Sequence, residues 1–410
     1  MTFIIGSESK YNKKYVFEVY KNEIKNVSQN LAIKTVTNIK DFEKFYNFSF
    51  ELYKDDPNWI PPFWMEIRDF FKKKNPFWTH AEARLFIVYQ DNIAVGRIAA
   101  IIDHKFCETT GEKVGYFGFF ECINDFTIAS ALFEVAEEWL ASKGMSLMRG
   151  PINGRIDVGC GFLYEGFHLA PSILSSYSPK YYLDFAKKYG MKKLRDQLIY
   201  WLDLTKPIPD ILEKTAECCN KEGVKIRRFK HLQAEAELKW WIKLMKDLFS
   251  EHWGYVPVSY DEVKMRFGIK QSRWSVDSRL FLIAEVDNRP VAFIWATPDY
   301  NQVFKKMDGK LGINGILKFL WHKRKINQGK LNLIGSKREY CNQGIASYLN
   351  YCAMLEMKRR GYAGAEIGWV DEFNSASLKI IEKTGARLYK KFRVFEKDIQ
   401  VDGKGIAHKC

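Results

Sequence analysis

The chain has 410 residues, of which 47% are apolar and 15% aromatic, and its formal net charge is +15. This length is too great for one ordinary hydrophobic core and fits two domains, while the aromatic content excludes a globally disordered chain. The positive charge favours polyanionic partners, among them nucleic acid, anionic lipid and phosphorylated coenzymes, without choosing between them.

Location and metal binding are constrained by what the sequence lacks. The apolar run at the N-terminus is too short for the core of a signal peptide, and no apolar stretch approaches the ~18 residues that span a bilayer. We therefore expect a cytoplasmic protein. The eight cysteines form no CxxC pair and do not cluster with the seven histidines, so we expect neither a metal site nor a disulfide framework.

Apolar periodicity in the first half predicts a hairpin followed by further strands and helices. The hairpin turns at Asp91 and Asn92, and Asp125 is suited to cap the long helix that Gly144 ends. The predicted elements are strands 85–89, 93–102, 114–122, 147–150 and 197–204 and helices 126–143 and 181–189.

The second half repeats this order of elements, and its hairpin turns at Asp287 and Asn288. The predicted elements are strands 280–286, 291–295, 330–335, 363–370 and 387–395 and helices 345–360 and 375–383. We interpret the repeat as an internal duplication. It predicts an α/β (α+β) fold of two tandem domains, each a mixed, mainly antiparallel sheet flanked by helices. The predicted boundaries are 1–204 and 224–399 for the domains, 205–223 for a connector and 400–410 for a tail.

A strand, a polar turn and a helix start follow one another at 333–346 (LIGSKREYCNQGIA). A helix that begins at a glycine-containing turn exposes unpaired backbone N–H groups and the positive end of its dipole. Such an end binds phosphate, and Gly344 and Ala346 are small enough to let a pyrophosphate approach the backbone.

Residues 339–346 (EYCNQGIA) resemble the pyrophosphate loop of the GNAT superfamily of N-acetyltransferases, with a cysteine at 341 where that loop has arginine or glutamine. Residues 374–386 (NSASLKIIEKTGA) resemble its second signature, with Ile381 where many members have a tyrosine general acid. The resemblance implies acyl-CoA as co-substrate and no metal. The residues it assigns to acyl-CoA are Leu333, Ile334, Gly335, Cys341, Asn342, Gln343, Gly344, Ile345, Ala346, Asn374 and Ser377.

The chain from about 31 to 399 resembles a bacterial family of double-GNAT proteins. The segments that carry this resemblance are 52–62 (LYKDDPNWIPP), 96–100 (GRIAA), 118–121 (GFFE), 148–153 (MRGPIN) and 166–167 (GF). Most members are uncharacterised, and some are implicated as bacterial ceramide synthases, which acylate a long-chain base from acyl-CoA. The resemblance implies N-acyl transfer from acyl-CoA to an amine, which can be a lipid or a long-chain base.

Only the second half carries a phosphate loop, so the first half is interpreted as a degenerate copy that walls a substrate channel. An amine acceptor must lose a proton to a base. Three carboxylates near strand 363–370 are candidates, Glu366, Asp371 and Glu372, and we select Glu366 and Glu372. A backbone N–H near Ile334 or Gly335 is expected to polarise the thioester.

Three further segments carry expectations. Arg149, Asn153 and Glu165 lie in a glycine-rich stretch that we expect to line a gap between the domains. The aromatic cluster at 59–64 is suited to core packing or to a lipid chain. Residues 301–330 hold eight Lys and Arg against one acidic residue, interspersed with Ile, Leu, Phe and Trp. Such a segment at 300–329 favours contact with the anionic inner surface of a membrane or an apolar channel.

Two other functions stay open. Aminoacyl transfer from tRNA, as in the peptidoglycan-bridge transferases, also uses paired GNAT folds, but those enzymes need no CoA loop, so 343–346 (QGIA) argues against it and against a nucleic-acid partner. A non-catalytic ligand-binding protein is the third possibility, and Ile381 in the tyrosine position is its main support.

Overall fold

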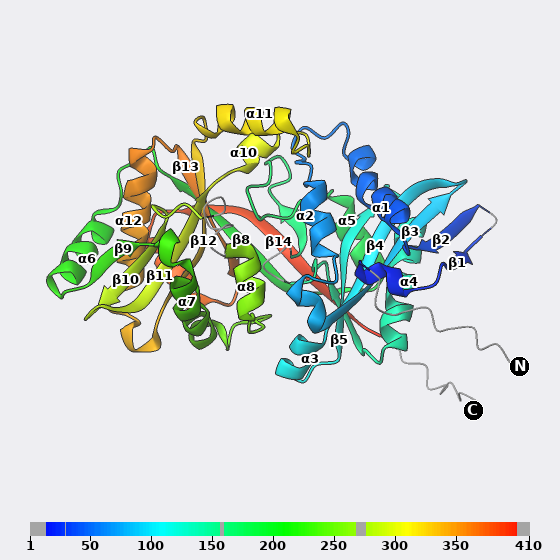
Figure 1. Cartoon of the computed structure of the whole chain (residues 1–410), viewed down its shortest axis with the longest axis horizontal. Coiled ribbons are helices and arrows are strands. Elements are labelled where there is room, and N and C mark those ends of the chain that lie inside the picture. The colour runs from blue at the N-terminus through cyan, green and yellow to red at the C-terminus, as the bar shows by residue number, and fades with distance from the viewer. Residues whose placement is uncertain (1–13, 29, 156–159, 268–275, 400–410) are drawn as a thin grey trace, which may run out of the picture.

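The structure, a computed structural model, describes residues 14–28, 30–155, 160–267 and 276–399. The predicted tail at 400–410 lies outside these residues, as does Gly159 of the glycine-rich stretch. In the described part of the chain, fourteen strands form one continuous mixed sheet with helices on both faces (Figure 1). The α/β fold of two tandem, similarly built halves is as predicted.

The strand order across the sheet is β1-β2-β3-β4-β5-β6-β14-β8-β13-β12-β11-β10-β9, with β7 beside β14. The strands are β1 (Ile24–Asn26), β2 (Leu31–Thr35), β3 (Ala81–Gln90), β4 (Ile93–Asp103), β5 (Val114–Cys122), β6 (Leu147–Gly150), β7 (Phe162–Glu165), β8 (Lys192–Asp203), β9 (Lys225–Arg228), β10 (Phe281–Val286), β11 (Arg289–Pro298), β12 (Gln328–Ser336), β13 (Gly364–Asp371) and β14 (Arg387–Asp398).

Helices flank this sheet throughout. The α-helices are α1 (Ile39–Leu52), α2 (Trp64–Phe70), α3 (His104–Thr110), α4 (Phe126–Ser142), α5 (Tyr181–Lys188), α6 (Asp210–Lys221), α7 (Ala234–Phe249), α8 (Tyr260–Phe267), α10 (Asn301–Phe304), α11 (Ile313–Lys323), α12 (Ile345–Arg359) and α13 (Ser375–Lys383). Short 3₁₀ turns lie at Val16–Val19, Pro76–Thr79, His231–Gln233 and Arg338–Tyr340.

The two hairpin turns confirm the repeat that the sequence predicts. Asp91 and Asn92 both have positive φ (49° and 65°), as do Asp287 and Asn288 (50° and 59°). Two consecutive residues with positive φ make the type I′ turn, which matches the twist of the flanking strands. The same turn therefore joins β3 to β4 and β10 to β11.

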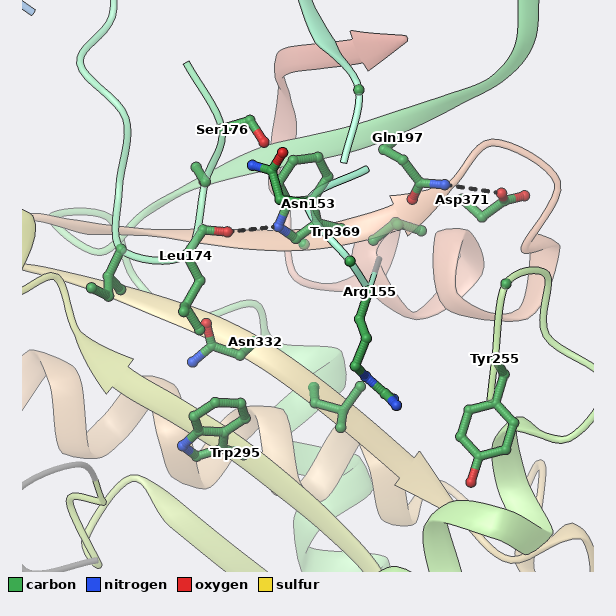
Figure 2. A pocket seen from close by; sticks show the side chains of 18 of the residues that line it. Asn153, Arg155, Leu174, Ser176, Gln197, Tyr255, Trp295, Asn332, Trp369 and Asp371 are labelled. Carbon is green, nitrogen blue, oxygen red and sulfur yellow. Dashed lines mark hydrogen bonds between the residues drawn. The ribbon is translucent and has the colours of Figure 1, made fainter. Parts of the chain in front are cut away.

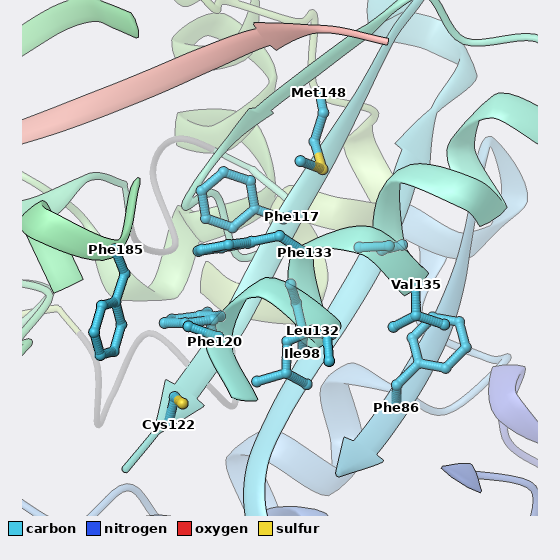
Figure 3. Packing of buried hydrophobic residues seen from close by; sticks show 14 of the residues in the cluster. Phe86, Ile98, Phe117, Phe120, Cys122, Leu132, Phe133, Val135, Met148 and Phe185 are labelled. Carbon is cyan, nitrogen blue, oxygen red and sulfur yellow. The ribbon is translucent and has the colours of Figure 1, made fainter. Parts of the chain in front are cut away.

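Each half buries both faces of its sheet. In the first half, α4 and α5 cover one face, where Leu132 and Phe133 pack with Ile98 and Phe117 (Figure 3). Helix α1 covers the other face. In the second half, α12 and α7 lie on opposite faces of the sheet. Residues of α12 pack with Ile294 and residues of α7 pack with Phe293, and adjacent residues of a strand point to opposite faces.

The two halves exchange their last strands. Strand β8 of the first half pairs antiparallel with β13 of the second, and β14 of the second half pairs antiparallel with β6 of the first. The exchanged strands also pair with each other along most of their length, from Arg387–Trp201 to Glu396–Lys192. Residue 204, the predicted end of the first domain, therefore follows a strand that lies inside the sheet of the second half.

Candidate active site

A gap opens between β12 and β13 in the second half. These neighbours pair in parallel only as far as Leu331 and Ile367. At the same point β12 bulges: Leu331 and Leu333 pair with adjacent residues of β11, which leaves Asn332 as the extra residue. A bulge bends its strand and re-aims side chains, and bulges are common beside active sites.

A cavity of about 1290 Å³ runs through this gap. Asn350 and Ile381 line it on the α12 side of the sheet, and Trp241 and Met245 line it on the α7 side. The cavity continues between the two halves, where its wall is mostly apolar. First-half residues in this wall include Phe63, Ile67, Phe70, Phe77, Phe119, Phe120 and Phe162. Ligand pockets commonly enclose about 300–1,000 Å³, so this chamber has room for more than a small amine.

The residues predicted to bind acyl-CoA lie along β12, in the turn after it, at the start of α12 and at the start of α13. Leu333 and Ile334 line the cavity, as do Asn374 and Ser377 at the start of α13. The Asn374 side chain accepts a hydrogen bond from the Ser377 backbone N–H (3.0 Å) and so caps that helix. The other predicted residues lie outside the lining, along the end of β12, the turn and the first residues of α12: Gly335, Cys341, Asn342, Gln343, Gly344, Ile345 and Ala346.

Helix α12 begins at Gly344, where φ is +80°, a left-handed conformation that favours glycine. No side chain caps this end, so its first N–H groups and the dipole stay available to a ligand. Helix α6, in the predicted connector, braces the turn: the Cys219 thiol lies 3.3 Å from the Gln343 carbonyl oxygen. A Cβ on Gly344 would lie 2.5 Å from Thr215.

In the first half, the N-terminus of the corresponding helix α4 is capped by a side chain. Helix α4 follows Asp125, whose carboxylate accepts a hydrogen bond from the Thr127 backbone N–H (2.7 Å). A negative side chain therefore occupies the position in which a phosphate would sit.

Glu366, the first predicted base, lies in a buried ion pair outside the cavity lining. Its carboxylate accepts a hydrogen bond from Lys390 Nζ (2.6 Å) and another from the Ser172 hydroxyl. The side chains of Lys390 and Glu366 are only 2% and 5% exposed. Each carboxylate oxygen of Glu366 therefore has a hydrogen-bond partner, and the residue is not part of the cavity lining.

Two further buried ionisable residues, Lys330 and Asp299, contact the same loop of the first half. Lys330 Nζ donates hydrogen bonds to the Ile173 carbonyl and the Ser175 hydroxyl (both 2.7 Å), and Asp299 accepts one from the Ile173 N–H (2.8 Å). Burial lowers the pKa of Lys330 to about 8 and raises the pKa of Asp299 to about 6. The cluster thereby fixes residues 172–175 of the first half onto the sheet of the second.

Glu372, the second predicted base, also lies outside the lining and is ion-paired with Lys193 (2.8 Å). Its neighbour Asp371 does line the cavity. Arg195 Nη1 donates a hydrogen bond to the Asp371 carboxylate (3.0 Å). Gln197 Nε2 donates another (3.2 Å; Figure 2). The assignment of Glu366 and Glu372 as bases stays a prediction, while Asp371 is the carboxylate of this strand that faces the cavity.

Two curated relatives match nearly the whole chain. One, from Caulobacter vibrioides (strain NA1000 / CB15N), is named bacterial ceramide synthase; it is 30% identical over 375 residues, 90% of this chain and 97% of the relative. The other, protein YghO of Escherichia coli (strain K12), is 30% identical over 382 residues, 91% of this chain and 97% of the relative. The chain belongs to the family of these proteins. No family model matches it.

Solved structures of similar shape are GNAT proteins. A tandem GNAT protein from the clavulanic acid pathway superposes with a TM-score of 0.54 at 11% identity, covering 90% of this chain and 99% of that one. A GCN5-related N-acetyltransferase from Sphaerobacter thermophilus gives 0.51 at 13% identity, covering 92% and 98%. These identities show the fold alone. The predicted resemblance to double-GNAT proteins is thus confirmed, and the chain has the fold of tandem GNAT proteins.

Two polar atoms in the gap between β12 and β13 have no hydrogen-bond partner among the described residues. Trp295 Nε1 and Asn332 Oδ1 are both buried, and both side chains line the cavity from the neighbouring strands β11 and β12 (Figure 2). Unpaired buried polar atoms are rare, and a ligand or water commonly satisfies them. The sequence analysis missed both residues, although an asparagine inside the otherwise apolar run 331–334 is a visible signal.

The loop between α7 and α8 brings His252 to the edge of the cavity. Partial burial lowers the pKa of His252 from its ordinary value of 6.5, and the charge of Asp371 opposes that shift. The lowered pKa favours the neutral imidazole, which is the form that can accept a proton. The sequence analysis did not single out His252, because it predicted neither of the two helices that hold its loop.

Of the three first-half residues that the sequence predicts to line an inter-domain gap, one lines the cavity and two do not. Asn153 lines the cavity, and its side-chain oxygen accepts a hydrogen bond from the Phe119 N–H (2.6 Å). Arg149 and Glu165 do not line it, which corrects that expectation. Arg149 is buried against Glu396 (2.6 Å), and Glu165 pairs on the surface with a lysine of β14.

Proposed function

We propose that this protein transfers an acyl group from acyl-CoA to the amine of an amphiphilic, long-chain acceptor. One observation carries the proposal: the cavity lies at the gap in the sheet, where it is lined by Ile334 of the strand that leads to the uncapped start of α12, and it continues into a large apolar chamber between the halves. A cofactor with a phosphate end and an acceptor with an alkyl chain can therefore meet at the gap from opposite faces.

The donor side fits coenzyme A. Backbone N–H groups at Gly344 to Ala346 would hold the pyrophosphate, and Asn374 and Ser377 would contact the pantetheine arm. This path leads to the stretch of β12 beyond Leu331, which does not pair with β13. A backbone N–H near Ile334 or Gly335 would polarise the thioester carbonyl there. Ile381 has no proton to give, so the departing sulfur has to take its proton from solvent or from the base.

The acceptor side favours an alkyl chain. The chamber between the halves is mostly apolar and aromatic, and burial of apolar surface contributes roughly 25 cal/mol per Å² to binding. The name of the Caulobacter relative, bacterial ceramide synthase, supports a long-chain base as the class of acceptor.

His252 is the base that the cavity supports best. The neutral imidazole would take a proton from the acceptor ammonium, and Asn332 Oδ1 would accept a hydrogen bond from the amine that results. The amine nitrogen then forms a bond to the thioester carbon, and the carbon–sulfur bond breaks. The products are an amide and the free thiol of CoA.

The test is an assay of the purified protein with acyl-CoA donors from two to eighteen carbons. Each donor is offered to a long-chain base and to a short soluble amine, and amide and free thiol are measured. We expect equal amounts of N-acylated long-chain base and thiol, with little product from the short amine. Absence of thiol release with every pair would refute the proposal, as would product formation only with aminoacyl-tRNA as donor.

A further inference from the structure

Helix α11 exposes an apolar face. Its large side chains recur at the spacing of one helix face, and each is more than half exposed. They are Ile313 (79%), Ile316 (52%), Leu317 (59%), Leu320 (56%) and Trp321 (71%). Only the opposite side packs inward, through Gly315 and through Phe319, which contacts Tyr300 and Phe304. In an ordinary surface helix these apolar side chains would face the protein core and polar ones would face water. A large exposed apolar face indicates an interaction with an apolar partner.

Basic side chains accompany this face, because Lys318, Lys323 and Arg324 lie on α11 or at its end and others lie in the same segment. Seven Lys and Arg of the segment are exposed, against the single acidic residue Asp308. The basic residues are Lys305, Lys306, Lys310, Lys318, Lys323, Arg324 and Lys325. A short helix with an apolar face and a basic rim has the chemistry of a segment that lies in the interface of an anionic bilayer. A protein partner would have to match both an apolar face and a wide excess of positive charge.

The segment adjoins one wall of the cavity. The Phe304 ring packs on Phe63 with centroids 4.8 Å apart, and Lys305 Nζ donates a hydrogen bond to the Pro57 carbonyl. Phe63 and Phe304 both line the cavity, together with Trp59, Ile60, Pro61 and Pro62. Figure 1 shows α10 and α11 along one edge of the molecule, over the seam between the halves. Of the predicted aromatic cluster, only Trp64 packs elsewhere, against Phe42 and Tyr46.

We infer that α11 docks the protein on an anionic bilayer surface, with its apolar face in the interface and its basic rim on the lipid headgroups. The cavity wall formed by 59–63 then lies next to the membrane from which an amphiphilic amine would come. This inference rests on the proposed function for the identity of that amine. Among the described residues no helix is long and apolar enough to cross a bilayer, so contact through α11 is peripheral.

The experiment is flotation of the full-length protein with vesicles of phosphatidylcholine alone or with 30% phosphatidylglycerol, at low and high salt. We expect binding to the anionic vesicles at low salt and its loss at high salt. Replacing Lys318, Lys323, Arg324 and Lys325 by Gln should weaken binding by about fivefold per charge. The variant Leu317→Ser/Trp321→Ser should also weaken it at least tenfold, whereas Ile211→Ser/Leu232→Ser, equally exposed but distant in sequence, should not.

Three outcomes would overturn the inference: wild-type protein that ignores anionic vesicles at low salt, α11 variants that bind as wild type does, or a wild-type dimer in light scattering that the α11 variants dissociate without any vesicle binding. N-acylation of a detergent-dispersed acceptor separates the two proposals. If that reaction proceeds while vesicle binding fails, only the docking inference is lost. If vesicles bind and no acyl donor reacts, only the proposed function is lost.

Discussion

The Glu366–Lys390 ion pair is almost completely removed from water. Strand alternation correctly identifies Glu366 as a polar side chain on one face of β13, but it cannot show what lies opposite. Its partners come from β14 and from residue 172 of the first half, so only the folded chain brings them together. The sequence therefore indicates the relevant strand, and in the structure Asp371 at its end is the carboxylate that lines the cavity.

Glu366→Gln should destabilise the protein by about 3–5 kcal/mol, because it leaves the Lys390 ammonium buried without its counter-charge. Urea denaturation followed by tryptophan fluorescence measures the change. Glu372→Gln is the matched control, since Glu372 and Lys193 are 20% and 39% exposed and such a pair is worth about 0–1 kcal/mol. A Glu366→Gln protein of normal stability and no activity would instead support Glu366 as the base.

His252→Gln should lower the rate of acyl transfer about 10²–10⁴-fold if the imidazole is the base. Because the neutral form is active and burial lowers its pKa, wild-type activity should persist at pH 7 and fall as the pH drops below 6.5. Asp371→Asn removes the charge that raises this pKa, so its acid limb should lie at a lower pH than that of wild type. The measurement is a pH–rate profile of wild type, His252→Gln and Asp371→Asn. If the acid limb is still present in His252→Gln, a group other than His252 titrates there.

Elements with strong local signals were predicted well. The turns at 91–92 and 287–288 fix both hairpins, and capping and glycine stops fix α4, α12 and α13 to within a residue or two. Helices α7 and α8 were missed, and so was the loop between them that carries His252. The pairing of β8 with β13 was also missed, because no local pattern tells a strand which of two similar sheets it will join.

The start of α12 can be tested without disturbing its fold. Gly344 is a poor site for this, since a Cβ there would meet Thr215 at 2.5 Å and φ is +80°. Ala346→Glu instead adds a negative charge to the first turn, which the helix dipole tolerates or favours but a pyrophosphate does not. We expect CoA affinity, measured by calorimetry, to fall at least tenfold in Ala346→Glu and far less in Ala346→Gln.

Melting temperatures provide the control for this pair of variants, and both should lie within a few degrees of wild type. Equal CoA affinity in the Glu and Gln variants would place the pyrophosphate away from α12. That result would contradict the predicted position of the acyl-CoA site only. The proposal that the apolar chamber binds the acceptor would still stand.

At the scale of the whole molecule, the exchanged strands make the halves interdependent. A fragment of residues 1–204 carries β8 but lacks β14, the neighbour of β6, and a fragment of 205–410 lacks β8, the neighbour of β13. Each fragment expressed alone should be insoluble or largely unfolded, whereas co-expression should give a soluble complex that copurifies through a tag on one fragment. Circular dichroism of the separate fragments is the measurement, and a cooperatively folded, soluble 1–204 would contradict the expectation.

The crossing of β8 and β14 also bears on how such a chain evolves. When a duplicated gene yields two copies that merely sit side by side, the copy without a task can be deleted. Here each copy supplies a strand to the sheet of the other, so deletion of either would unravel both. If acyl-CoA binds the second half alone, as we propose, the first half is retained for its strand and is free to change its inner surface. Under that proposal, specificity for new acceptors can be acquired by mutation of the first-half cavity wall without a change in the donor site.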